Sequence, residues 1–337
     1  MNNSPPPPED QAAVTSVAPG LTSIRLPLPF ALDHVHVWLL EEADGWTVID
    51  TGVSSNRSRV LWEGIIEHHF CKRPLRRLVA THYHPDHLGL ADWLCQRFEA
   101  PLWMTQTEWL LARLLSQDHS PSLQAAYHAF YQAMGLEEEA TTRLQERGNA
   151  YARGVPSVPA QYRRLKQGDQ LEMGGRTWQV ITSGGHSPEH ACFYAEQDRL
   201  LIAGDMVLPR ISPNVSVWPL EPEADPLQDF LDGLLRLRQL PADTLVLPSH
   251  GLPFRHLHQR IDALIQHHTE RLAETEADCR TTARTVAEVT GTLFRRPLDT
   301  HQLSFAAGEA LAHLNHLIGQ GKLKRSLGKD GVWLFSA

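Results

Sequence analysis

The chain carries the stretch Thr81-His82-Tyr83-His84-Pro85-Asp86-His87, in which three imidazoles and one carboxylate fall within six positions. It directly follows the largely apolar run Leu75 to Ala80, which predicts a buried strand, so the four side chains lie on the loop at its C-terminal end. Imidazole and carboxylate together are typical ligands of zinc, and also of iron or manganese. Such a density of metal-competent groups favours a metal site over a histidine-rich surface loop.

The pattern His-x-His-x-Asp-His resembles the metal-binding motif of the metallo-β-lactamase superfamily. The resemblance implies a further histidine for a first metal ion, an aspartate that bridges two ions and a last histidine for the second ion. Candidates occur in the expected order, and each follows a strand-like apolar run and a turn. They are His186 in Gly184-Gly185-His186-Ser187-Pro188, Asp205 after Leu200 to Ala203, and His250 after Thr244 to Leu247.

The same resemblance assigns a role to each candidate. It implies that Asp50, in Val48-Ile49-Asp50-Thr51-Gly52, accepts a hydrogen bond from a ligating imidazole; a turn aspartate before Gly52 is the alternative, and both can hold. The implied cofactors are two divalent metal ions, with Zn²⁺ foremost and Fe or Mn as alternatives. The first ion takes His82, His84 and His186, the second takes Asp86, His87 and His250, and Asp205 bridges them.

The fold class expected from these motifs is α/β (α+β). Residues 21–255 resemble the αββα metallo-β-lactamase sandwich, and residues 1–20 read as a disordered, Pro-rich tail. Residues 104–165 have a helical pattern that a minimal version of this fold lacks, with a capping box expected at Thr105-x-x-Glu108. We expect this helical insertion to form a lid or one wall of the pocket; the alternative is that its aromatic residues only pack helices together or form a homodimer interface.

A second, smaller domain is expected over residues 256–337. Its three helices and C-terminal hairpin resemble a winged-helix module, which in related hydrolases more often braces the catalytic domain or shapes the pocket than binds nucleic acid. Residues 281–337 hold seven Lys or Arg and four Asp or Glu, a weak basic excess. Nucleic acid is therefore a disfavoured partner. His313 and His316 have helical spacing and, without a third partner, favour an exposed helix face over a metal pair.

Composition limits the remaining classes. The chain has 337 residues and a formal net charge of -8, which argues against general attraction to nucleic acid or to anionic membranes. No apolar run approaches 18 residues, and the N-terminus lacks the features of a secretory signal. The four cysteines are scattered and form no Cys-x-x-Cys pair, as expected in a reducing compartment. We therefore expect a cytoplasmic protein without a membrane partner.

The resemblance implies a hydrolase in which a metal-bridging hydroxide cleaves an ester, a thioester or a lactone of a small organic substrate. Asp86 and Asp205 are the expected catalytic carboxylates, and Tyr83, His190 and Arg210 are candidate substrate contacts. The motif Gly-x-Ser-x-Gly is absent, which disfavours a serine hydrolase. Two alternatives stay open: an oxidoreductase that resembles the mononuclear iron persulfide dioxygenases, and a nuclease or phosphodiesterase that uses the winged helix to bind nucleic acid.

Overall fold

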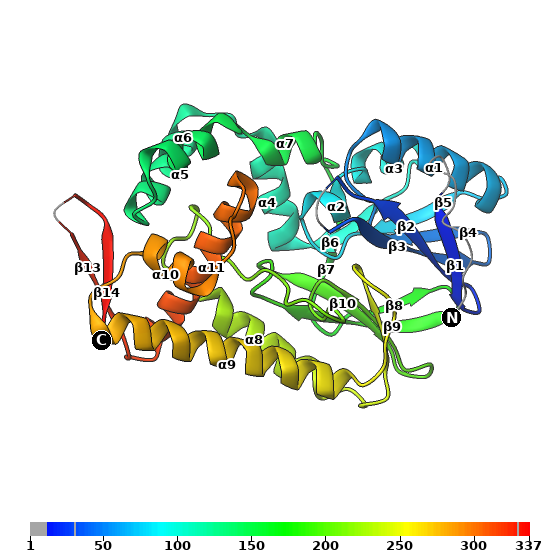
Figure 1. The fold of residues 1–337 in the computed structure, drawn as a ribbon. Helices are drawn as coiled ribbons and strands as arrows, with labels where there is room; N and C mark the ends of the chain where they lie inside the picture. Colours follow the sequence, from blue (N-terminus) through cyan, green and yellow to red (C-terminus); the bar gives the residue numbers. More distant parts are fainter. Residues whose placement is uncertain (1–11, 30–31, 329) are drawn as a thin grey trace.

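The computed structural model describes residues 12–29, 32–328 and 330–337 and contains two β-sheets that stack face to face (Figure 1). The first has the strand order β1-β2-β3-β4-β5-β6-β7 and the second has the order β12-β11-β10-β9-β8. The first sheet consists of β1 (Ala13–Ala18), β2 (Leu21–Pro27), β3 (His34–Glu42), β4 (Gly45–Ile49), β5 (Leu75–Val79), β6 (Leu102–Thr105) and β7 (Arg163–Leu165). The second consists of β8 (Gln170–Met173), β9 (Arg176–Ser183), β10 (His190–Ala195), β11 (Leu200–Gly204) and β12 (Leu245–Pro248).

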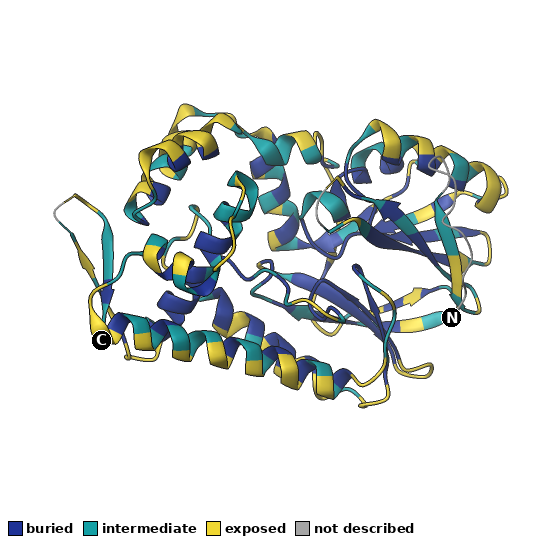
Figure 2. Cartoon of the chain, in the orientation of Figure 1, coloured by how far each residue is buried: buried dark blue, intermediate teal, exposed yellow. Residues whose placement is uncertain are grey.

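Side chains of alternate residues separate the core into layers, as the two-residue period of a strand requires. Along β3, Trp38 and Leu40 belong to the layer between the sheets, whereas Val37 and Leu39 belong to the outer layer of the first sheet. Phe193 enters the layer between the sheets from β10. Every residue of β10 and β11 is buried, which explains why these strands are apolar on both faces (Figure 2).

Helices cover both outer faces and complete the predicted sandwich of two sheets between helices (Figure 1). On the first sheet lie α1 (Asn56–His69) and α3 (Ala91–Phe98), and the short α2 (Pro85–Leu88) follows the histidine-rich loop. The second sheet packs against α8 (Pro226–Leu237) and α9 (Leu257–Thr281). Our sequence analysis did not identify α8, although its buried residues recur at helical spacing: Leu227, Phe230, Leu234 and Leu237.

The helical insertion lies between β6 and β7, so the range 104–165 predicted for it includes the end of one strand and all of another. Its aromatic side chains contact other parts of the insertion, the C-terminal helices and the histidine-rich loop, where Tyr151 lies against Tyr83; a lid or pocket wall stays a prediction. Trp109 stacks on Tyr162 with ring centroids 4.5 Å apart, whereas Phe130 and Tyr131 pack against the C-terminal helices. The insertion comprises α4 (Gln106–Gln117), α5 (Pro121–Ala133), α6 (Glu138–Glu146) and α7 (Ala150–Gly154).

The C-terminal part continues from α9 into two helices and a hairpin. These are α10 (Val286–Leu293), α11 (Thr300–Gly319), β13 (Lys324–Leu327) and β14 (Trp333–Ser336). The expectation that His313 and His316 form an exposed face is wrong. Both are buried, and His313 Nε2 lies 3.2 Å from His268 Nδ1 of α9. None of the helices in the described ranges is long and apolar enough to cross a membrane.

The disordered tail predicted over residues 1–20 is too long. Ala13–Ala18 form β1, which pairs with β2 in antiparallel register. Its apolar residues Val14, Val17 and Ala18 pack against the core, so this segment becomes ordered as an edge strand of the first sheet. Residues 1–11 of the predicted tail lie outside the described residues.

Candidate metal centre

The ends of several strands meet where the two sheets come together. β4 runs parallel to β5, and β11 runs parallel to β12, so the C-terminal ends of each pair share one edge. Backbone hydrogen bonds join the sheets at this edge: Ala191 N–H donates to Thr81 O at 2.8 Å, and His36 N–H donates to Ser249 O at 2.7 Å. All loops that carry predicted ligands are therefore brought to one place.

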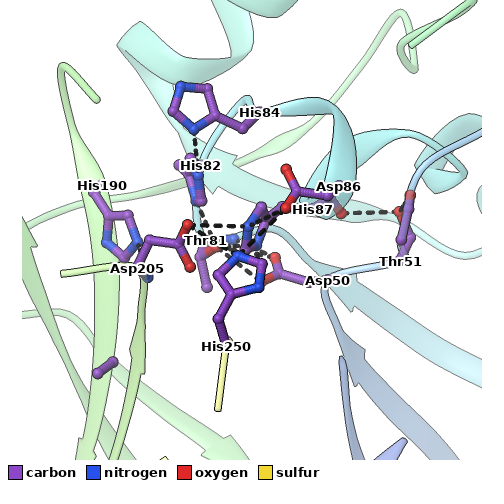
Figure 3. Close-up of polar contacts among 12 residues, drawn as sticks. Asp50, Thr51, Thr81, His82, His84, Asp86, His87, His190, Asp205 and His250 are labelled. Atoms are coloured by element: carbon purple, nitrogen blue, oxygen red, sulfur yellow. Dashed lines mark hydrogen bonds and ion pairs between the residues drawn. The ribbon is translucent and has the colours of Figure 1, made fainter. Parts of the chain in front are cut away.

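The structure brings the seven predicted ligands into one cluster. Figure 3 shows His82, His84, Asp86, His87, Asp205 and His250 of this cluster. The three groups that converge closely enough to hold a metal ion are His82, His84 and His186; Asp86, His87 and His250; and His82, His87 and Asp205. Asp205 lies at the centre, because its Oδ2 is 3.5 Å from His87 Nε2, 3.4 Å from His186 Nε2 and 3.3 Å from His250 Nε2. Asp205 therefore reaches ligands of both predicted ions.

Two features of the cluster are consistent with bound metal ions: the distances between the ligand atoms, and buried polar atoms without a hydrogen-bond partner. A tetrahedral ion with bonds of about 2.0–2.1 Å separates its ligand atoms by roughly 3.3–3.4 Å, close to the separations around Asp205. Among the described residues, His87 Nε2, His186 Nε2 and Asp205 Oδ1 are buried without a hydrogen-bond partner. Burying such atoms unpaired is costly, so their convergence indicates that a cation belongs between them.

The other ring nitrogen of several ligands donates a hydrogen bond that fixes the direction of the ring. In each case an oxygen accepts from Nδ1–H, which leaves the lone pair of Nε2 directed into the cluster. The pairs are His87 with Asp50 Oδ2 at 2.8 Å, His186 with Asn214 O at 2.8 Å, and His250 with His34 O at 2.6 Å.

Asp50 forms the hydrogen bond expected of it and also organises the histidine-rich loop. It follows β4 directly and adopts a left-handed backbone conformation, with φ of 63°. One carboxylate oxygen accepts from the Thr81 backbone N–H at 2.8 Å, and the other accepts from Thr81 Oγ1 at 2.9 Å and from His87. Asp50 therefore combines the two readings of its sequence, as a turn residue and as the partner of a ligand.

Burial and the charges within the cluster strongly shift the pKa values of its histidines and carboxylates. Burial opposes protonation of His250, but the carboxylates of Asp205 and Asp86 outweigh it and raise the pKa of His250 to about 10. Burial opposes the charged form of Asp205 as well, yet His250 and His87 hold the pKa of this carboxyl well below its ordinary value. Burial and the neighbouring His186 lower the pKa of His84 to about 3. Metal ions that bind here displace protons, so their affinity rises with pH.

The exposed fractions of the ligand side chains show which side of the cluster faces solvent. Asp86 has a side-chain exposure of 19 %, against 0 % for His87 and 8 % for Asp205. His84 is also partly exposed, whereas the other ligands are buried. The approach to the cluster therefore lies beside His84 and Asp86.

Glu108 belongs to the site, although our sequence analysis assigned it to a capping box that does not form. Its fully buried carboxylate accepts from Tyr83 N–H at 2.9 Å, from Ser187 Oγ at 2.7 Å and from Glu189 N–H at 2.6 Å. Burial raises the pKa of Glu108 to about 7. It ties the loop of His82 and His84 to the loop of His186. Its position on the buried stripe of α4, four residues before Ala112, was the available signal.

The three candidate substrate contacts lie in different surroundings. His190 is fully buried behind the cluster, where its Nε2 accepts from the Asp205 backbone N–H at 3.2 Å. A side chain at Gly204 would meet that ring within 2.4 Å. Tyr83 is 6 % exposed and packs in the core, with its carbonyl accepting from Tyr151 Oη at 2.7 Å. Neither the His190 nor the Tyr83 side chain is accessible in this structure, whereas Arg210 is exposed, and the role of all three as substrate contacts stays a prediction.

Comparisons with known proteins agree with this geometry. The family model described as the Metallo-beta-lactamase superfamily matches residues 31–250, and the model of the Metallo-beta-lactamase-like, C-terminal domain matches residues 272–337. The crystal structure of a beta-lactamase domain protein from Burkholderia ambifaria has 44% sequence identity and a TM-score of 0.90, covering 99% of this chain and 96% of that chain. A metallo-beta-lactamase family protein from Thermus thermophilus has 29% identity and a TM-score of 0.79, covering 95% of this chain and 99% of that chain.

Two curated proteins add functional names to the similarity. The probable metallo-hydrolase YqjP of Bacillus subtilis is 25% identical over 77% of this chain and 78% of its own length. A hydroxyacylglutathione hydrolase of Idiomarina loihiensis is 33% identical over 65% of this chain and 62% of its own length. The chain belongs to the metallo-β-lactamase superfamily, and it is a metallo-hydrolase of that superfamily.

Proposed function

We propose that the protein is a dinuclear metal hydrolase that cleaves a thioester, an ester or a lactone of a small organic molecule. The observation that carries the proposal is the position of Asp205 Oδ2, within 3.5 Å of Nε2 of His87, His186 and His250. A single carboxylate that reaches both groups of ligands can serve as a bridge between two neighbouring ions. We propose zinc first, because imidazoles and carboxylates are its usual ligands and because hydrolysis needs no redox-active metal.

In this proposal each group of the cluster has a separate task. His82, His84 and His186 would hold one ion, Asp86, His87 and His250 the other, and Asp205 both. Two bound divalent ions supply Lewis acidity, which makes water acidic enough to deprotonate near neutral pH and polarises the carbonyl of the substrate. Asp86, the more exposed carboxylate, would hold one ion and could accept a hydrogen bond that orients the attacking water. Buried ligands such as His87 and His250 keep their direction through the hydrogen bonds at Nδ1.

Thioesters are the substrates that we place first. The Idiomarina loihiensis relative is named as a hydroxyacylglutathione hydrolase, and such an enzyme cleaves the thioester of an acylated thiol. An acyl group on a thiol other than glutathione is an equally good candidate. Arg210, exposed on the loop after β11, is the group that we propose to hold a carboxylate or phosphate of the substrate.

A hydrolysis panel with protein of known metal content tests this proposal. The panel contains an acyl-CoA, a glutathione thioester, a lactone, an aryl ester and a phosphodiester, and each reaction is repeated with His84→Ala. We expect cleavage of one of the first four classes, its loss on chelation and its absence in the variant. One iron per chain together with oxygen consumption would replace the hydrolase by a dioxygenase, and cleavage of the phosphodiester alone would favour a nuclease.

We further propose that the C-terminal part has a winged-helix-like arrangement that does not bind nucleic acid. Several of its basic side chains already have acidic partners, which reduces the charge available for phosphates. Arg295 pairs with Glu274 at 2.7 Å, Lys322 with Glu276 at 3.7 Å, and Arg325 with Glu223. Another of the predicted basic residues, Lys329, lies outside the described residues.

A reducing compartment, and hence the cytoplasm, is the location that we propose. All four cysteines are free thiols, and Cys95, Cys192 and Cys279 are buried. Burial raises the pKa of Cys192, so this thiol next to the cluster stays protonated and inert. Disulfides, which stabilise many exported proteins, therefore have no part in holding this fold together.

A further inference from the structure

The segment between β11 and α8, residues 205–225, joins the metal centre to the C-terminal helices. It begins with Asp205, and its Asn214 carbonyl accepts the hydrogen bond from His186 Nδ1 at 2.8 Å. The segment contains no helix or strand of its own. A connection of this length needs contacts from elsewhere in the fold to have one conformation.

Those contacts come from α9 and α11. Arg260 of α9 donates to the carbonyls of Leu208 and Ile211 at 2.5 and 2.7 Å. Asn315 of α11 donates to the carbonyls of Pro222 and Ala224 at 3.1 and 2.9 Å. His316 Nδ1 lies 3.1 Å from the Asp225 carboxylate. The C-terminal helices therefore hold the segment along most of its length.

The contacts are closest beside Asn214. Ser216 Oγ lies 2.7 Å from Asn214 Oδ1 and 3.1 Å from the carbonyl of Phe305, and Asn214 Nδ2 lies 3.4 Å from Glu309 Oε2. Val217 N–H donates to Gly308 O at 3.1 Å. A β-carbon at Gly308 would meet the Ser216 β-carbon at 2.8 Å, so glycine lets α11 approach the segment this closely. The Asn214 side chain is held on both sides, which fixes the direction of its carbonyl.

The contacts that direct His87 and His250, two ligands assigned to the second ion, come from other parts of the fold. His87 is directed by Asp50, which follows β4, and His250 is directed by the carbonyl of His34 in β3. β3 and β4 both belong to the first sheet. The C-terminal helices thus influence the direction of His186, whereas His87 and His250 are directed by residues beside β3 and β4.

We propose that Asn214 is a positioning residue through which the C-terminal helices set the affinity of the first metal ion. The proposal rests on the two-ion site of the proposed function. The anchored Asn214 carbonyl keeps the His186 ring at the angle that His82 and His84 require. Releasing Asn214 from Ser216 and Glu309 frees its carbonyl to move, and the first ion then binds more weakly while the second does not.

The test is a stepwise zinc titration of the full-length Asn214→Ala variant against a chromophoric chelator. The variant keeps the carbonyl and loses both side-chain anchors. His186→Ala identifies the step that belongs to the first ion, and cobalt absorption reports the ligand geometry. The matched control is Gln132→Ala, because the Gln132 side-chain amide also donates to a glutamate, Glu138, at 3.3 Å, on the helical insertion.

We expect Asn214→Ala to weaken the first zinc step about 10-fold, the lower end of what outer partners of metal ligands contribute, and to change the cobalt spectrum. The second step and Gln132→Ala should match the wild type. Ser216→Ala, which removes one anchor, should give a smaller loss in the same step and serves if Asn214→Ala does not fold.

Equal zinc affinity of the wild type and both variants, in a protein that binds two ions and hydrolyses its substrate, would overturn this inference and leave the proposed function standing. An equal loss in both steps, or the same loss in Gln132→Ala, would also overturn it, because either result indicates general loosening. A wild type that binds no divalent ion would instead remove the proposed function itself.

Discussion

The two halves of the metal centre are built differently. In the second group of ligands, His87 and His250 take their orientation from Asp50, which follows β4, and from His34 at the start of β3. The first group depends on parts outside the sandwich, because Glu108 of the insertion joins its two loops and Asn214 directs His186. The comparison teaches that residues beside β3 and β4 direct His87 and His250, whereas Glu108 and the segment held by the C-terminal helices support the first group.

The largest effect is expected where the two halves meet. Asp205→Asn replaces a charged ligand that contacts both groups, so turnover should fall by more than the roughly 100-fold that loss of an outer partner costs. Metal content and steady-state rates measure this, with circular dichroism as the check on folding. Asp198→Asn, at an exposed carboxylate paired with Arg176, is the control. Substantial activity in Asp205→Asn would contradict the assignment of the bridging residue.

A selective loss is expected at the second half. Asp50→Ala removes the acceptor for His87 Nδ1–H and for the Thr81 backbone, so the second zinc step should weaken about 10- to 100-fold. The first step should weaken less. The same chelator competition measures both, with Asp92→Ala as the control because Asp92 bonds only to the exposed Gln96. Equal losses in both steps would show that the halves are not independent.

A pH effect of moderate size is expected from the C-terminal side. Burial raises the pKa of Glu309 to about 7, above its ordinary value of 4.5. Its contribution to the free energy of unfolding is therefore fully present below pH 4.5 and is lost as the pH rises through 7. Glu309→Gln should flatten this fall by on the order of 1 to 3 kcal/mol. Urea unfolding of chelator-treated protein at pH 4.5 and pH 8 measures it. Parallel pH curves for the wild type and the variant would contradict the expectation.

The smallest effect is expected at Arg210, on the exposed loop after β11. Arg210→Ala should raise KM a few-fold for a substrate with a carboxylate or phosphate and leave kcat unchanged, because an exposed ion pair contributes about 1 kcal/mol or less. Arg57→Ala on α1 is the control for loss of an exposed arginine. A fall in kcat without a change in KM would place Arg210 in the chemistry instead of substrate binding.

The same contrast explains how much the sequence predicted. The convergence of the seven candidate ligands was predictable because the resemblance to a known family indicated where to look after the histidine-rich loop, and because each candidate follows a strand-like run, as His186 and Asp205 do. The position of Asp50 was predicted from the same resemblance. The sandwich followed from these strands and from their resemblance to a known family.

The residues that position the first group of ligands were not predictable in the same way. Asn214 acts through its backbone carbonyl, which leaves no trace in residue type. Glu108 was read as a local cap because the sequence does not show that α4 turns it toward Tyr83. His313 and His316 were expected to be exposed because helical spacing alone does not reveal that α9 and the segment 205–225 cover them. Such long-range contacts depend on how the helices pack, which short patterns do not encode.

Zinc stoichiometry measured together with hydrolysis tests the central claim most directly. Protein stripped with a chelator is titrated with zinc while cleavage of the best substrate of the panel is followed. The account predicts two equivalents bound, no cleavage in the stripped protein and full activity only when both steps are filled. Full activity of the stripped protein, or activity that is complete at one equivalent with no second step, would contradict it.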